Sequence, residues 1–192
     1  MGRMSESNNV NEGIDIEEGK KDSNSKKSFI TEWGIPIISA IILAFLINKF
    51  LLFKVLIPSE SMVPTLNVGD RLFVTRVYNL EKLKRGDIIV FHSEELQDSL
   101  IKRLIGLPGD KIKIENGKVF VNGEELQENY IGAEDNFNGE YEVPEGKYFF
   151  LGDNRGDSFD SRYWVNKYID FNDIKGKAFI KVFPFDEFGF IN

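Results

Sequence analysis

Hydrophobic and polar positions divide the chain into three parts. Residues 1–27 are almost entirely polar, and Phe29–Phe53 form a nearly continuous apolar run. From Lys54 onward, short apolar segments alternate with turn residues, and helical periodicity is scarce. This pattern predicts an all-β fold, in which an antiparallel β-sheet domain over 54–192 follows one N-terminal transmembrane helix over 28–53.

The polar segment 1–27 is rich in Ser, Asn, Glu, Lys and Gly. A segment of this composition buries too little apolar surface to offset the entropy lost on ordering. We therefore expect 1–27 to be a disordered tail.

The apolar run has an uncharged centre from Trp33 to Asn48, slightly short of the about 20 residues that cross hydrocarbon. Lys49 can snorkel, and Phe50–Phe53 extend the apolar surface beyond it. A buried core helix and a cleaved signal peptide are the alternatives. The long polar leader and the lack of an A-x-A pattern after the run favour an uncleaved anchor.

The charges that flank the run predict its orientation. Four lysines precede it, and Lys49 and Lys54 follow closely. Because positive flanks tend to stay in the cytoplasm, we expect a cytoplasmic N-terminus and an extracytoplasmic β domain in a single-pass cell-membrane protein.

The region after Lys54 contains several segments rich in β-branched or aromatic residues, typical of strands. They are Arg71–Val77, Asp87–His92, Ser99–Gly106, Gly146–Asp153 and Gly176–Phe185. Lys111–Gly123 is predicted to be a hairpin, because two alternating strands flank Asn116-Gly117, a strong two-residue turn signal.

Composition narrows the possible chemistry. The chain has no cysteine and one histidine, so thiolate metal sites, disulfides and a cysteine nucleophile are excluded. The net charge of -7 gives no global basic field for nucleic acid. We expect no metal, no cofactor and no nucleic-acid partner.

The segment "IPSESMVPTL" places two serines, Ser59 and Ser61, directly after the apolar run. A serine hydroxyl needs a neighbouring base to become a nucleophile. His92 is one candidate, although a lone histidine at a strand end is more often a surface residue. Lys102 is the other, because Leu100 and Leu104 share its strand face and burial lowers a lysine pKa. A lysine that protects a strand edge is the structural alternative.

Four blocks occur in order after the anchor: "PSESMVPTL", "GDIIVF", "IKRLIGLPGD" and "GDNRGDSFDSRYW". Together they resemble the bacterial type I signal peptidases (leader peptidases), and the short spacing resembles the single-span Gram-positive form. The blocks cover Pro58–Trp164, most of the β-rich region. The resemblance implies a membrane-bound serine endopeptidase that removes N-terminal signal peptides from exported preproteins.

By this resemblance, Ser61 is the nucleophile and Lys102 is the general base. The Ser61 backbone N–H and the Ser59 hydroxyl would hold the oxyanion, and Ser158 would orient the lysine. The resemblance also implies that Asp160 and Arg162 form a structural salt bridge beside the site, and that Asp153 and Arg155 tie the same loop together.

The implied substrates are signal peptides, which carry small residues at the first and third positions before the cut. Shallow apolar pockets select such residues, and by position we expect walls from Ile57, Leu66, Leu72 and Ile101. The substrate could add as a strand beside Ser61 and Lys102. The lipid bilayer is the second expected partner. For the phenylalanine-rich end, 179–190, a core role is favoured over contact with lipid.

Two other functions fit parts of the pattern. A membrane-anchored chaperone of related fold would lack the lysine or the orienting serine, whereas Lys102 and Ser158 are both present. A self-cleaving serine–lysine repressor would carry a DNA-binding helix-turn-helix in place of the anchor, and the sequence has no such pattern.

Overall fold

The computed structural model describes residues 30–79, 82–132 and 135–191. The expected tail over 1–27 lies outside the described residues. The chain divides into two compact units, Met1–Ala44 and Phe45–Asn192.

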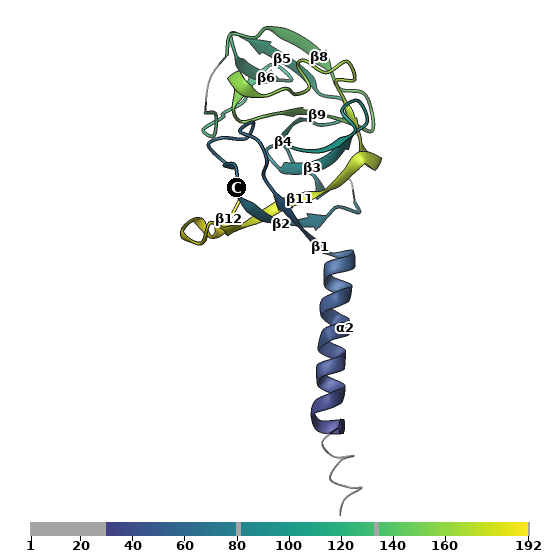
Figure 1. Ribbon diagram of the computed structural model, residues 1–192. Coiled ribbons are helices and arrows are strands. Elements are labelled where there is room, and N and C mark those ends of the chain that lie inside the picture. Colours follow the sequence, from purple (N-terminus) through teal and green to yellow (C-terminus); the bar gives the residue numbers. More distant parts are fainter. Residues whose placement is uncertain (1–29, 80–81, 133–134, 192) are drawn as a thin grey trace, which may run out of the picture. The chain divides into compact units, whose positions relative to one another are not determined.

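The apolar run forms a short π-helix, η1 (Ile30–Gly34), which continues as the α-helix α2 (Ile35–Phe50) (Figure 1). Thr31–Phe50 is the one helix among the described residues that is long and apolar enough to cross a membrane. None of the side chains of α2 is buried, so the alternative of a core helix gains no support. The helix ends at Phe50, three residues before the expected end at residue 53. Leu52 and Phe53 already belong to the first strand.

The predicted antiparallel β domain is confirmed. Eight strands form one sheet in the order β1-β2-β11-β3-β4-β9-β10, with β12 paired to β11. Its strands are β1 (Leu52–Leu56), β2 (Arg71–Arg76), β3 (Ile88–Ser93), β4 (Asp98–Gly106), β9 (Lys147–Leu151), β10 (Ile169–Asp170), β11 (Ile174–Phe183) and β12 (Gly189–Phe190). The five strand segments predicted from the sequence correspond to β2, β3, β4, β9 and β11.

A second sheet has the order β7-β6-β5-β8. It consists of β5 (Lys111–Glu115), β6 (Lys118–Val121), β7 (Glu124–Glu125) and β8 (Gly139–Glu142). The predicted hairpin joins β5 to β6, and Asn116 and Gly117 both have positive φ, 51° and 79°. These angles fit a type I′ turn, the two-residue turn that the Asn-Gly pair favours.

Three clusters of buried side chains fill the domain. The first lies under β1, β2 and the segment after β1, the second around Phe91, Phe150 and Trp164, and the third between β9 and the smaller sheet. Single-turn 3₁₀ helices occur in the connections, at η3 (Arg155–Asp157), η4 (Phe171–Asp173) and η5 (Phe185–Glu187).

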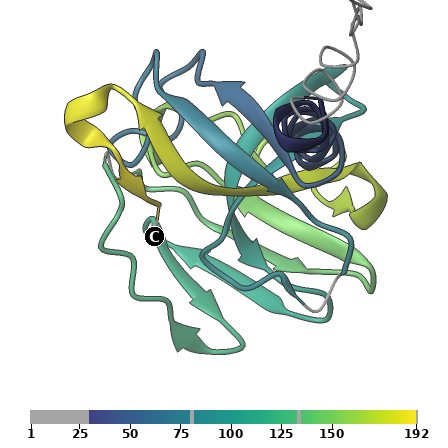
Figure 2. The same cartoon turned by 90° about the horizontal axis from the view of Figure 1, so that it is seen from below.

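The expected core role of the phenylalanine-rich end is wrong for most of its rings. Phe183, Phe185, Phe188 and Phe190 are 40–81% exposed. The pairing of β11 with β2 ends where Phe183 meets Arg71, and the chain then turns through η5 and returns as β12 beside β11. Figures 1 and 2 both show this hairpin (yellow) projecting at one end of the domain.

Candidate active site

Ser61 lies in a closed turn directly after β1. Backbone hydrogen bonds join Ile57 to Asp70 and Gly69 and close the segment at its base. Met62 and Leu66 are fully buried and anchor the turn in the first core cluster. Ser61 itself is 8% exposed. The turn is therefore fixed by packing, with the serine at the edge of the core.

Ser59, in the same turn, and the loop that contains Gly152 and Asn154 both lie against Ser61. The hydroxyl oxygens of Ser59 and Ser61 are 3.3 Å apart. The Asn154 backbone N–H donates to the Ser61 carbonyl oxygen at 3.1 Å. Gly152 packs so closely that a Cβ there would collide with the Ser61 carbonyl oxygen and the Ser158 hydroxyl. The turn that holds Ser61 and the loop that holds Ser158 therefore meet at Gly152.

Lys102 is buried in β4, with 4% of its surface exposed. Its partner across β3 is Ile89, and Leu104 on the same strand face belongs to the same core cluster as Ile89. Burial lowers the pKa of Lys102 from 10.5 to about 8, while the negative charge of Asp160 opposes the shift. Among the described residues, no hydrogen bond or ion pair reaches the Lys102 ammonium group. A neutral amine is thus accessible near physiological pH.

Ser158 carries the second unusual polar group of the site. Its hydroxyl is buried and has no hydrogen-bond partner among the described residues. An unpaired buried hydroxyl costs free energy, and the buried Trp164 Nε1 is likewise unpaired among the described residues. Asp153, Asp157 and Asp160, on the loop that carries Ser158, all act to raise the pKa of Lys102, against the larger effect of burial. The loop therefore lies around the lysine.

Asp160 and Arg162 form the expected ion pair. Arg162 Nε donates to Asp160 Oδ1 at 2.8 Å and Nη2 donates to Oδ2 at 2.9 Å. Asp160 also accepts a hydrogen bond from the Gly152 backbone N–H at 3.0 Å. Arg155 contacts Glu128 at 2.5 Å and the Gly152 carbonyl oxygen at 3.0 Å. These contacts fix Gly152, against which both serines pack.

The partner of Asp153 is Arg103, a residue that the sequence interpretation missed. Arg103 Nε and Nη2 donate to the two carboxylate oxygens at 2.8 and 2.6 Å. Thr65 donates to the same carboxylate at 2.5 Å, and the Arg103 guanidinium lies 3.7 Å from the centre of the Tyr130 ring. The available signal was the alternation of "IKRLIG", which places an arginine on the opposite face of a buried strand, where it needs a counter-ion.

This network joins the Ser61 turn, β4 and the Gly152 loop, so its loss should be costly. Asp153→Asn should lower the free energy of unfolding by about 3–5 kcal/mol, because it leaves the Arg103 charge buried without its counter-ion. Urea unfolding followed by circular dichroism measures the change.

The double variant Asp153→Asn/Arg103→Met serves as the control, because it removes both charges. It should recover much of the loss, since replacing a whole buried ion pair is often nearly neutral. Additive losses in the double variant would contradict the coupling.

The four predicted pocket residues gather in one cluster, and one of them, Ile101, lines a groove. Ile57, Leu66, Leu72 and Ile101 all belong to the first core cluster. A groove of about 460 Å³ lies between β1 and β4, and Ile101 lines it together with Val55 and Val90. The other three predicted residues are fully buried in the core cluster to which Ile101 and Val90 also belong.

His92 lies away from Lys102. It pairs with Ser99 across β3 and β4, whereas Lys102 pairs with Ile89. The His92–Ser99 pair and the Ile89–Lys102 pair are three residues apart along the strands, which corresponds to about 10 Å. The histidine is half-buried and contributes no contact to the Ser61 turn among the described residues.

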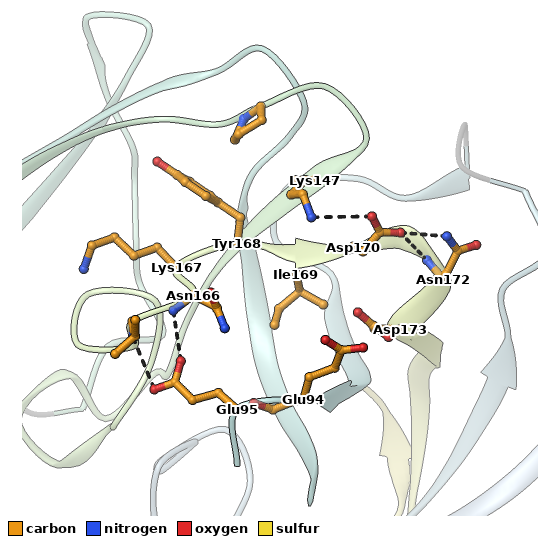
Figure 3. Close-up of a pocket in the computed structure, with 13 residues that line it drawn as sticks. Glu94, Glu95, Lys147, Asn166, Lys167, Tyr168, Ile169, Asp170, Asn172 and Asp173 are labelled. Carbon is orange, nitrogen blue, oxygen red and sulfur yellow. Dashed lines mark hydrogen bonds and ion pairs between the residues drawn. The ribbon is translucent and has the colours of Figure 1, made fainter. Parts of the chain in front are cut away.

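A polar cavity of about 610 Å³ lies beside β10, apart from the residues above (Figure 3). Glu95 reaches across it and accepts hydrogen bonds from the backbone N–H groups of Val165 and Asn166, at 3.2 and 2.9 Å. On another wall, Lys147 and Asp170 form an ion pair at 3.5 Å. The cavity wall thus holds in place the loop that follows Trp164.

In this antiparallel β domain, a serine turn, a buried lysine and a second buried serine adjoin one loop. Comparison with known proteins gives the family. Residues 30–183 match the signal peptidase family, peptidase S26, and the chain belongs to that family.

Individual relatives match over most of the chain. A probable signal peptidase I-2 from Synechocystis sp. is 37% identical over 190 residues, which are 95% of this chain and 86% of the relative. Signal peptidase I P from Bacillus subtilis subsp. natto is 40% identical, with coverages of 83% and 92%. Signal peptidase I from Leptolyngbya laminosa is 40% identical, with coverages of 78% for both chains.

Proposed function

We propose that this protein is a membrane-bound serine endopeptidase that removes signal peptides from exported preproteins, with Ser61 as the nucleophile and Lys102 as the general base. Membership of the signal peptidase family supports the reaction. The observation that carries the mechanism is Lys102, a buried amine whose pKa is lowered to about 8 and whose charge has no ion-pair partner among the described residues.

The chemistry proceeds through an acyl-enzyme. The neutral Lys102 amine accepts the Ser61 hydroxyl proton as the serine oxygen attacks the scissile carbonyl carbon. The Ser61 backbone N–H and the Ser59 hydroxyl donate hydrogen bonds to the oxyanion. The Lys102 ammonium returns the proton to the leaving amine. A water molecule, activated by the same lysine, then hydrolyses the ester and releases the signal peptide.

The groove offers two free strand edges to an extended substrate. Among the described residues, β1 pairs only with β2, and β4 pairs with β9 only from Arg103 onward. The edge of Asp98–Lys102 that faces away from β3 is therefore open. A substrate strand between β1 and β4 gains backbone hydrogen bonds from both sides, with small side chains near Ile101 and Val55.

The apolar helix Thr31–Phe50 supports attachment to a membrane, and membership of the signal peptidase family is consistent with this attachment. We assign the N-terminus to the cytoplasm and the β domain to the outer side, from the lysines that flank the span. Preproteins would then reach Ser61 as they emerge from the membrane, because few residues separate Phe50 from Ser61.

Cleavage of a purified preprotein tests the proposed function. The full chain in detergent micelles should cut at the end of the signal peptide, and His92→Ala should cut at the same rate. A chain that binds the preprotein without cutting it would instead indicate a chaperone.

Ser158→Ala should lower kcat about tenfold to a hundredfold, because it removes the unpaired hydroxyl that we assign to hydrogen-bond the Lys102 ammonium group during the reaction, and a hydrogen bond to a charged group contributes about 1.5–3 kcal/mol. KM should change little, since Ser158 acts on Lys102 and not on the substrate. Steady-state kinetics on a peptide substrate separates the two constants. Ser161→Ala is a buried control on the same loop; its hydroxyl accepts from the Phe150 N–H at 2.9 Å and is not assigned a role in the reaction. An equal loss of kcat in both variants would contradict the role of Ser158.

A further inference from the structure

The groove between β1 and β4 changes in character along its length. Near Lys102 its walls are apolar, from Val55, Val90 and Ile101. Asp98, Ser99 and Lys175 line the other end. The apolar part suits small side chains, whereas the far end offers charge and hydrogen bonds.

Lys175 reaches this end because of an irregularity in β11. Ile174 pairs with Phe91 and Gly176 pairs with Val90, so Lys175 is an extra residue between two consecutive partners. Such a bulge leaves its residue unpaired and turns the side chain in a new direction. Lys175 Nζ donates to the Ser99 hydroxyl at 2.6 Å. A serine in the wall of the groove thus holds the ammonium group.

In the part of the chain that the structure describes, Lys175 forms no ion pair, and the Asp98 carboxylate lines the same end of the groove. The Asp98 carboxylate accepts a hydrogen bond from the Ser99 backbone N–H at 2.7 Å. Lys54 also borders the groove, but its ammonium lies over the Phe73 ring, 5.3 Å from the ring centre. Lys175 is therefore the cation that a bound peptide meets.

The position that meets Lys175 follows from strand geometry. Ser99 precedes Lys102 by three residues, about 10 Å along β4. The groove extends from the catalytic end back along β1 and β4, so the part of the substrate before the cut runs parallel to both strands. Ser99 shares a strand face with Ile101, and alternate substrate residues point to that face. We place the third residue before the cut at the level of Ile101, so the residue at the level of Ser99, two positions earlier on the same face, is the fifth before the cut.

We propose that Lys175 is a specificity-determining residue that favours an acidic side chain at about the fifth position before the cut. This inference rests on the proposed function, because it takes the groove to be the binding site for the signal peptide. It adds a charge preference to the preference for small residues nearer the cut.

Binding and cleavage of three matched peptides test the inference. The peptides carry alanine at the first and third positions before the cut and differ only in Glu, Gln or Lys at the fifth. Their Kd values are measured by fluorescence anisotropy on the full-length Ser61→Ala variant in micelles, and kcat/KM on the wild type. Lys175→Glu is the test variant. Lys113→Glu makes the same change of charge in the smaller sheet, where Lys113 pairs with Glu115.

The Glu peptide should bind about threefold more tightly than the Lys peptide, with Gln between them, as expected for an exposed charge pair. Lys175→Glu should invert this order, and Lys113→Glu should retain it. Equal Kd values for the three peptides, or an order that Lys175→Glu leaves unchanged, would overturn the inference. Failure of the wild type to cut any peptide would count against the Ser61–Lys102 mechanism, while the order of Kd values still decides the role of Lys175.

Discussion

Ser61→Ala is expected to reduce kcat for preprotein cleavage by at least about a thousandfold, because no covalent intermediate can form without the hydroxyl. Binding should persist, since the Ser61 turn is held by Met62 and Leu66 and not by the hydroxyl. Single-turnover cleavage and a separate Kd measurement distinguish the two effects.

Ser59→Ala is the matched control for this variant. The two hydroxyl oxygens are 3.3 Å apart, so both variants remove a similar group from nearly the same place. Loss of one oxyanion donor should cost about a hundredfold in kcat. If Ser59→Ala abolished cleavage and Ser61→Ala retained it, the nucleophile would be assigned wrongly.

Lys102→Met is expected to abolish cleavage and, at the same time, to stabilise the fold. Catalysis should be lost because the variant removes the amine that we propose as the acceptor of the Ser61 proton. Stability rises because the wild type buries an ammonium group whose pKa falls from 10.5 to about 8. This difference corresponds to a cost on the order of 3 kcal/mol at pH 7.

The pH dependence of this gain has a definite sign. Below pH 8, Lys102 is protonated in both the folded and the unfolded chain, and the burial cost is fully present. The cost falls as the pH rises above 8, and it disappears above 10.5, where both states are neutral. The gain from Lys102→Met should follow the same course in urea unfolding. A variant that is less stable than the wild type at pH 7 would contradict the burial of an uncompensated charge.

Much of the fold was predictable because its strands are short and strongly patterned. Asn116-Gly117 defined the β5–β6 hairpin by local turn chemistry alone. By contrast, β7, β10 and β12 each have two residues, too few to produce a pattern. The exposed position of Phe185 was also unpredictable, because it depends on where the pairing of β11 with β2 stops, whereas Phe190 lies in β12, which is too short to produce a pattern.

The site was predictable to a different degree. The alternation around Lys102 indicated a buried strand face, and the structure has the lysine there. The roles of Ser61 and Ser158 came from resemblance to the family, since no local pattern links residues so far apart. The sequence did not predict the role of Arg103, because its partner Asp153 is distant in sequence. It did not predict the role of Lys175, because a bulge that the alternation of residues does not reveal determines where this side chain points.

The pH profile of kcat/KM tests most directly the central claim that a neutral Lys102 is the base. The value of kcat/KM should rise with pH, and the midpoint of the rise should lie near pH 8, since kcat/KM reports the pKa of the base in the free enzyme. The His92→Ala variant should show the same midpoint. A midpoint near the ordinary histidine pKa of about 6.5 in the wild type, which disappears in His92→Ala, would contradict the assignment. His92 would then be the base.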